Sequence, residues 1–477
     1  MVMSVETGAQ TYDCYVSTDN CFMQKSRVKA TSKCGQGERM GGLANVGQQF
    51  KAWGSCFNEL GWDALQLLPQ AKREEMARRL FAPDGDLGFT RGRFSMGAND
   101  YARGWYCCDS VAGDFTLKYF NINRDRETLI PYIKMAQRVC PEMTFWMSPW
   151  SPPSWMKINQ DYPVRSSRYS TMDPRKDFLL YEDVEQPDKR VFPRQLSTHD
   201  YLIQDPRYLQ CYADMFCRFI DEYAKEGIGI DMVMYQNEAW SYTPYPGCPW
   251  TANGIIRFNT QYLAPTLKRH HPEVRLWLGT INTNRREVVD KIVGDSAMQS
   301  CVEGVAFQWE GGQRLPEIHK RYPQLAYMCS ESECGRGTMD WRAAEHTFHL
   351  INHYLGNGCE EYTLWNPILA DSGTSPWGWR QNALIQVDSQ THEARLTPEY
   401  YAYMHYSHFI RPGSAITCYR PTSDDRLPVL VAKNGKGKQV IVMGNLGDNQ
   451  KRVCLPVGKR WLSVEMKAHS FCTLVER

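Results

Sequence analysis

The stretch IDMVMYQNE, residues 230–238, is an apolar run that ends in an asparagine and a glutamate. Nearly continuous apolar runs of this length are typical of strands buried on both faces of a parallel sheet. Seven further runs of the same kind are spread along the chain. We predict strands at residues 48–55, 88–97, 143–149, 230–238, 274–282, 304–310, 325–331 and 360–366.

Helical patterns separate these strands. The clearest begins at Asp205, which can cap a helix, with Pro206 suited to the first turn and Gly227 suited to the C-terminal end. A second helix is predicted near residues 342–354. Eight strands that alternate with helices indicate a (β/α)8 barrel of the α/β class. A doubly wound sheet is the alternative, but it would usually carry a Gly-rich phosphate turn after its first strand, and this chain has none.

Both ends of the chain differ from this alternation. The pattern of residues 429–445 predicts two strands joined by an Asn-Gly turn, and the pattern of residues 461–476 predicts two more strands. The N-terminal stretch QTYDCYVST, residues 10–18, can add a strand to the same unit. We therefore predict N-terminal strands within 1–44 that join a side domain, a catalytic barrel over 45–410, and a β-sandwich side domain over 411–477. A long polar segment, residues 156–204, is an excursion from the barrel that could border a cleft.

Composition is that of a globular protein, with 477 residues, 42% hydrophobic residues and a net charge of +2. Such a balance gives no indication of a nucleic-acid partner or an acidic membrane surface. The chain holds 15 Trp and 26 Tyr, which indicate either a large core or a cleft that stacks sugar faces. We find no signal-peptide pattern and no apolar run of 18 residues, so the 17 cysteines predict a cytoplasmic protein with reduced thiols. No metal site and no cofactor are predicted.

Polar and aromatic residues stand where the predicted strands end, which is where the active residues of a parallel barrel gather. Glu238 ends the fourth strand and Glu331 ends the seventh. Glycoside hydrolysis needs two such opposed carboxylates, one protonated to donate to the leaving oxygen and one ionised to attack the anomeric carbon. Other candidates at strand ends are Arg93, Asp100, Trp150, Asn237, Gln308, Trp309, Glu310, Trp365 and Asn366.

Structural alternatives exist for several of these residues. Trp150 and Trp365 could be core residues, Asp100 could cap a turn, and Arg93 could be an ion-pair partner inside the barrel. Their combination at one end of the barrel is what favours a sugar site.

Three motifs resemble those of glycoside hydrolase family 30. SPWSPPSWMK, residues 148–157, resembles the Ser-Pro-Trp-x-Ser-Pro-x-Trp-Leu-Lys motif of that family. YQNEAW, residues 235–240, resembles its Asn-Glu acid/base motif, and CSESECGRG, residues 329–337, resembles its nucleophile motif. The resemblance extends from about residue 41 to the C-terminus, and it implies a (β/α)8 barrel with a β-sandwich side domain.

The resemblance also implies a retaining mechanism. In it, Glu238 is the acid/base, Glu331 is the nucleophile, and Asn237 hydrogen-bonds the sugar 2-hydroxyl. We include Tyr245 as a further candidate for substrate binding. The residues that align with others around the sugar of this family are Arg93, Asp100, Trp150, Trp365 and Asn382.

The chain departs from the family pattern in three places, one of which is the Ala239-Trp240 pair that replaces a more usual Pro after the acid/base. Glu333 has the same strand parity as Glu331, so alternation does not separate them, and we prefer Glu331 because the Ser-Glu pair matches the motif. Where relatives often carry His-Trp-Tyr, this chain has QWE, which makes Glu310 a candidate specificity residue or third acid.

The predicted function is a retaining β-glycoside hydrolase, exo-acting on β-glucosides or β-xylosides, with a carbohydrate as its partner. An endo-β-glucanase or xylanase of the same family is the alternative. An inactive carbohydrate-binding relative is a third possibility, but the presence of both glutamates argues against it. The oligomeric state is left open.

Overall fold

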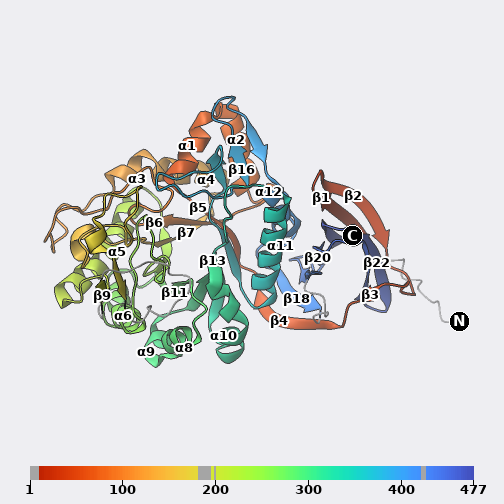
Figure 1. Cartoon of the computed structure of the whole chain (residues 1–477). Coiled ribbons are helices and arrows are strands. Elements are labelled where there is room, and N and C mark those ends of the chain that lie inside the picture. The colour runs from red at the N-terminus through yellow and green to blue at the C-terminus, as the bar shows by residue number, and fades with distance from the viewer. Residues whose placement is uncertain (1–9, 181–194, 198–199, 420–425) are drawn as a thin grey trace.

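A closed barrel of eight parallel strands forms the larger domain of the computed structural model, which describes residues 10–180, 195–197, 200–419 and 426–477 (Figure 1). The strands are β5 (Ala52–Cys56), β6 (Arg91–Ser95), β7 (Thr144–Ser148), β10 (Ile230–Met234), β11 (Arg275–Ile281), β12 (Gly304–Gln308), β13 (Ala326–Glu331) and β14 (Glu361–Leu364). They close in the order β10-β11-β12-β13-β14-β5-β6-β7. The predicted barrel is confirmed, with all eight strands in the expected chain order.

Helices follow or precede the barrel strands. They are α1 (Glu59–Leu67), α2 (Gln70–Phe81), α3 (Asn123–Glu127), α4 (Leu129–Val139), α5 (Pro206–Lys225), α6 (Ala252–Phe258), α7 (Ala264–His270), α8 (Arg286–Gly294), α9 (Ser296–Cys301), α10 (Leu315–Arg321), α11 (Trp341–Gly356) and α12 (Pro398–Ser407). The predicted caps of α5 are confirmed, since Asp205 accepts from the N–H of Arg207 and Gly227 has a φ of +71°. The second predicted helix corresponds to α11.

Large side chains and ion pairs fill the inside of the barrel. A buried cluster at its centre consists of Trp146, Met232, Met234, Trp277, Ala306 and Met328. Towards the N-terminal ends of the strands, Arg91 pairs with Glu361 and Asp231, each at 2.8 Å. The barrel is therefore a packed core and not a pore, so an active site is expected where loops project beyond the strands.

The smaller domain is a β-sandwich of two sheets. One has the order β2-β1-β23-β20-β19-β18-β4 and the other has the order β22-β21-β3. Their strands are β1 (Thr11–Thr18), β2 (Cys21–Lys29), β3 (Glu38–Arg39), β4 (Leu43–Gln49), β18 (Ala415–Tyr419), β19 (Val429–Lys433), β20 (Gln439–Asn445), β21 (Lys451–Val457), β22 (Arg460–Met466) and β23 (Ser470–Glu476). The N-terminal strand β1 pairs with β23, so the prediction that both ends of the chain build this domain is confirmed.

Helices α11 and α12 lie between the barrel and the sandwich (Figure 1). Phe348 of α11 stacks on Phe471 of β23 with ring centroids 4.2 Å apart. His405 of α12 is buried, and its ring nitrogens lie 2.8 Å from the hydroxyls of Thr473 and Ser17. Burial lowers the pKa of His405 to about 3, so this bridge is neutral at ordinary pH. The apolar stack and the neutral bridge join the two domains through buried side chains.

Several predicted details are wrong or incomplete. The predicted strand 48–55 is divided between the two domains, because β4 ends at Gln49 and pairs with β18 while β5 begins at Ala52. The prediction of reduced thiols fails at one pair, since a disulfide joins Cys34 to Cys454 while the other fifteen cysteines are free.

The long segment predicted over 156–204 is described only in part, because 181–194 and 198–199 lie outside the described residues. Within it, β8 (Phe178–Leu180) pairs with β9 (Gln195–Ser197). A further small sheet contains β15 (Ile368–Ala370), β16 (Ile385–Val387) and β17 (Ala394–Leu396). No helix in the described ranges is long and apolar enough to cross a membrane.

Candidate active site

Two glutamates meet at the end of the barrel where the strands finish. Glu331 is the last residue of β13, and Glu238 lies four residues beyond the end of β10. Glu238 has a φ of +50°, and its N–H donates to the hydroxyl of Thr280 at 3.0 Å. The left-handed backbone at Glu238 sets the direction of its carboxylate, which strand alternation alone would not predict. Both carboxylates are buried.

Arg93 connects Glu331 to Asn237, the neighbour of Glu238. Its Nη1 donates to Oε2 of Glu331 and its Nη2 donates to Oδ1 of Asn237, both at 2.6 Å. The guanidinium is fully buried and lies 4.7 Å from the ring of Trp150 and 5.6 Å from that of Trp365. Arg93 is thus the cation that balances Glu331, which is the ion-pair role named as its alternative.

Glu238 has neutral hydrogen-bond donors around it. Gln308 donates from Nε2 to Oε1 of Glu238 at 3.2 Å, and the Tyr245 hydroxyl donates to Oε2 at 3.3 Å. Gln308 is itself oriented by the Ser330 hydroxyl, which donates to its Oε1 at 3.0 Å. Gln308 ends β12, so its position at a strand end was the signal that placed it among the candidates.

The two carboxyl groups have different electrostatic surroundings, because Glu331 pairs with a cation and Glu238 accepts from neutral donors. Burial raises the pKa of Glu238 above its ordinary value, while its hydrogen bonds oppose the rise. Burial also raises the pKa of Glu331; the Arg93 guanidinium opposes this rise and the charge of Glu238 adds to it. Two buried acids that repel each other favour a single negative charge. The Arg93 guanidinium favours that charge on Glu331, whereas the donors described for Glu238 are neutral.

Two tryptophans, Trp150 and Trp365, and the acid Asp100 form a buried wall of the site beside the two glutamates. Trp150 and Trp365 stack with ring centroids 5.1 Å apart, and the Trp150 indole donates to Oδ1 of Asp100 at 3.1 Å. Gln381 donates to the other oxygen of Asp100 at 3.3 Å. Burial, Glu331 and Glu238 raise the pKa of Asp100 well above its ordinary value. Gln381 lies in the loop between β15 and β16, away from the ends of the barrel strands, and no sequence signal pointed to it.

Three other predicted residues lie at the margin of this group. Trp309 begins the short helical turn Trp309–Arg314 after β12 and is half-buried, whereas Glu310 beside it is exposed. Asn382 is buried, and its Oδ1 accepts from the N–H of Met339 at 3.3 Å, so it supports the loop that follows β13. The structure does not bring Glu310 into the buried carboxylate cluster.

The second acid of the SESE stretch points elsewhere. Oε2 of Glu333 lies 2.7 Å from Nε2 of His346 on α11, and this contact raises the pKa of His346. Strand β13 has ended at Glu331, so alternation no longer governs the direction of the side chain. Glu331 is therefore the acid at the barrel mouth.

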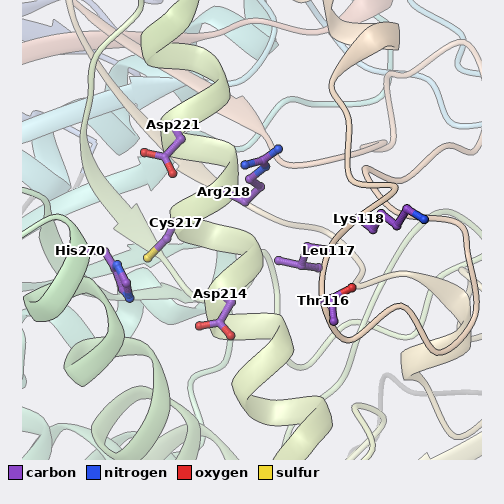
Figure 2. Close-up of a pocket in the computed structure, with 8 residues that line it drawn as sticks. All are labelled: Thr116, Leu117, Lys118, Asp214, Cys217, Arg218, Asp221 and His270. Carbon is purple, nitrogen blue, oxygen red and sulfur yellow. The ribbon is translucent and has the colours of Figure 1, made fainter.

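A surface hollow of about 550 Å³ lies on the flank of the barrel (Figure 2). It lies between the middle of α5, the loop at residues 116–118 and the end of α7. Its lining residues are Thr116, Leu117, Lys118, Asp214, Cys217, Arg218, Asp221 and His270. None of the carboxylate cluster lines it, so it is separate from the candidate active site.

Comparison with known proteins identifies the family. Residues 50–170 and 202–410 match the glycosyl hydrolase family 30 TIM-barrel domain. Putative glucosylceramidase 1 of Caenorhabditis elegans is 25% identical over 422 residues, which are 84% of this chain and 74% of that protein. An endo-1,6-beta-D-glucanase of Neurospora crassa is 21% identical over 388 residues, which are 77% of this chain and 72% of that protein.

A solved structure agrees with the fold. SrfJ from Salmonella typhimurium superposes with a TM-score of 0.82 over 98% of this chain and 99% of that chain, at 20% identity. Both domains are therefore shared with that protein. The family match covers the barrel and includes both glutamates; the chain belongs to glycosyl hydrolase family 30 and is a glycosidase.

Proposed function

We propose that the chain is a retaining β-glycosidase that removes terminal β-glucosyl residues. The observation that carries this proposal is the unequal environment of the two buried glutamates. Arg93 provides a positive charge to Glu331, while neutral donors surround Glu238. One acid is thereby prepared as an anion and the other as a proton donor, which is the division of labour that a double displacement requires.

In the first step, Glu331 attacks the anomeric carbon while the bond from that carbon to the leaving oxygen breaks. Glu238 gives its proton to this oxygen, so the leaving group departs as a neutral alcohol. In the second step, Glu238 takes a proton from water, the water oxygen bonds to the anomeric carbon, and the ester bond to Glu331 breaks. Two inversions give net retention.

Asn237 is positioned to assist by hydrogen bonding to the sugar. Its Oδ1 accepts from Arg93 at 2.6 Å and from Gln308 at 3.3 Å. With the oxygen occupied in this way, the amide N–H₂ is the group left to donate to a sugar hydroxyl. A contact to the 2-hydroxyl would strengthen in the transition state.

The far side of the site supports exo action. Asp100 is buried and its two oxygens are held by Trp150 and Gln381. We expect a buried wall of this kind to accommodate one terminal sugar and to block a second sugar beyond it. Asp100 offers buried acceptor oxygens for hydroxyls of that sugar. An endo-acting β-1,6-glucanase is the second candidate, because a relative bears that name.

Glucosides are favoured over xylosides as substrates. The names of the two relatives above refer to a glucosyl group and to a glucan. We expect wild-type enzyme to hydrolyse aryl β-glucoside fastest in a panel with β-xyloside, β-galactoside and β-fucoside. Proton NMR during the reaction should detect the β-anomer of the free sugar first. Initial release of the α-anomer would contradict the retaining mechanism, and release of oligosaccharides from β-1,6-glucan before glucose would favour endo action.

Arg93→Met is expected to lower kcat/KM by about 100-fold or more and to move the acid limb of the pH profile upward. Without the guanidinium, the pKa of Glu331 rises, so the nucleophile remains protonated to a higher pH. The buried, unpaired Glu331 should also reduce the free energy of unfolding by about 3–5 kcal/mol. Measurements of kcat/KM against pH, together with urea unfolding, test both effects.

Arg91→Met is the matched control for this variant. Arg91 lies on the same strand and pairs with Glu361 at the opposite end of the barrel. It should also destabilise the protein, but the acid limb should stay in place. An equal shift of that limb in both variants would mean that the effect on Glu331 is a general result of weakened folding.

A further inference from the structure

We propose that Tyr245, Trp379 and Tyr169 form an aromatic track that binds the ring of a sugar leaving group. This inference rests on the function proposed above and concerns the same site. The track begins at the acid Glu238 and leads outward to solvent. No residue of the track except Tyr245 was a sequence candidate, since the other two lie in loops away from the barrel strands.

The inner end of the track is fixed by Tyr245. Its hydroxyl donates to Oε2 of Glu238 at 3.3 Å, and its ring centroid lies 6.0 Å from that of Trp379 at an angle of 71°. Because Glu238 protonates the leaving oxygen in the proposed mechanism, the leaving group must occupy the side of the site on which Glu238 stands. Trp379 is the aromatic side chain whose ring contacts that of Tyr245.

The outer end is built from a second loop. An added Cβ on Gly378, which has a φ of +75°, would lie 2.4 Å from the ring of Tyr169, so this ring packs against the backbone next to Trp379. The guanidinium of Arg168 lies 4.7 Å from the centroid of the Tyr169 ring. Exposure increases along the track, from 7% at Tyr245 to 40% at Trp379 and 43% at Tyr169.

Both loops are held in place by buried hydrogen bonds. The hydroxyl of Tyr101 donates to the carbonyl of Gly373 at 2.6 Å, and the carbonyl of Trp379 accepts from the N–H of Ser375 at 2.7 Å. Buried Lys157 donates to the carbonyls of Tyr162 and Gly247, each at 2.7 Å, which ties the loop after β7 to the loop after β10. A surface that is fixed before binding loses little entropy when a ligand orders on it.

The side chains of the track fit a sugar better than a lipid chain. Flat rings with polar edges, such as an indole and a phenol, pack on the C–H faces of pyranoses while hydrogen-bonding their hydroxyls. An acyl chain would instead need a continuous aliphatic surface. The other strongly exposed large hydrophobic residues of the described chain are Leu43, Val111 and Tyr119, which lie in the sandwich and in the loop between β6 and α3.

The test compares leaving groups with and without a ring. We expect Trp379→Ala to lower kcat/KM about tenfold on the best of the four common β-linked glucobioses. Its kcat/KM on β-glucosyl fluoride, whose leaving group is a single ion, should remain unchanged. Tyr169→Ala should have the same selectivity with a smaller effect, and Trp379→Phe, which keeps a ring, should recover most of the activity on the disaccharide.

Tyr119→Ala is the matched control, because Tyr119 is 52% exposed but lies outside the track. Equal losses on fluoride and disaccharide in Trp379→Ala, or no loss on either, would overturn the aromatic track while leaving the proposed function intact. Octyl β-glucoside, whose leaving group is an alkyl chain, tests the choice of a sugar ring. If Trp379→Ala lost activity only on this substrate, the leaving group would be a lipid-like chain and not a sugar. A wild-type enzyme that hydrolyses the fluoride but no disaccharide would also overturn the choice of a sugar ring. A wild-type enzyme that hydrolyses neither glucosyl nor xylosyl fluoride would refute the proposed function itself.

Discussion

Glu331→Gln is expected to lower kcat on an aryl β-glycoside by about 10⁴-fold to 10⁶-fold, which is the largest effect of any single substitution in this chain. An amide cannot form the ester intermediate, and removal of a nucleophile costs most of the chemical acceleration. Glutamine also replaces the charged partner of Arg93 by a neutral one of nearly equal volume. Steady-state kinetics with the sugar that wild-type enzyme prefers would measure the loss.

Glu333→Gln is the matched control, because Glu333 lies two residues away and is paired with His346. It should retain nearly full activity. Azide provides an independent check, since it can attack in place of the carboxylate when Glu331 is replaced by glycine. The expected product is the α-glycosyl azide, formed by a single inversion. Retained activity in Glu331→Gln, or a loss of activity only in Glu333→Gln, would mean that Glu333 and not Glu331 is the nucleophile.

Glu238→Gln is expected to have an effect that depends on the leaving group. We expect kcat/KM to fall about 10²-fold to 10⁴-fold on an alkyl or sugar β-glycoside, whose leaving oxygen needs a proton. The formation of the glycosyl-enzyme from a dinitrophenyl glycoside should be affected far less, because that leaving group departs as a stable anion. A series of aryl glycosides of graded leaving-group pKa would measure this dependence.

The pH profile gives a second readout of the same variant. Glu238 must be protonated to donate, so wild-type activity falls as the pH rises through its pKa, which burial places above the ordinary value for glutamate. With glutamine at this position, the rate of the first step, the formation of the glycosyl-enzyme, should no longer fall at high pH, so the basic limb of its profile should disappear. Glu310→Gln, at an exposed acid near the site, should leave the limb unchanged. Persistence of the basic limb in Glu238→Gln would assign it to another group.

Much of the fold could be predicted because barrel strands carry a local signal. Each is buried on both faces and therefore appears as a short apolar run between helical patterns, and α5 adds an explicit cap at Asp205. The first strand was predicted wrongly at residues 48–55, because two consecutive apolar strands belong to different sheets. Strand β4 joins the sandwich because it pairs with β18, and β5 joins the barrel because it pairs with β14. Both partner strands lie more than 300 residues away in the sequence.

The sequence by itself determined the eight-strand barrel, Glu238 as one candidate acid and Glu331 or Glu333 as the other, since strand ends and family motifs are local features of the chain. Only the tertiary structure decided between Glu331 and Glu333, because the chain leaves β13 at Glu331 and the direction of Glu333 is then set by His346. Arg93 as the counterion of Glu331 was likewise decided by folding, and so was Trp379 beside Tyr245. The last two contacts join residues more than 100 positions apart, whereas Glu333 and His346 are 13 positions apart but lie on different elements. All three contacts arise from packing, which no local pattern encodes.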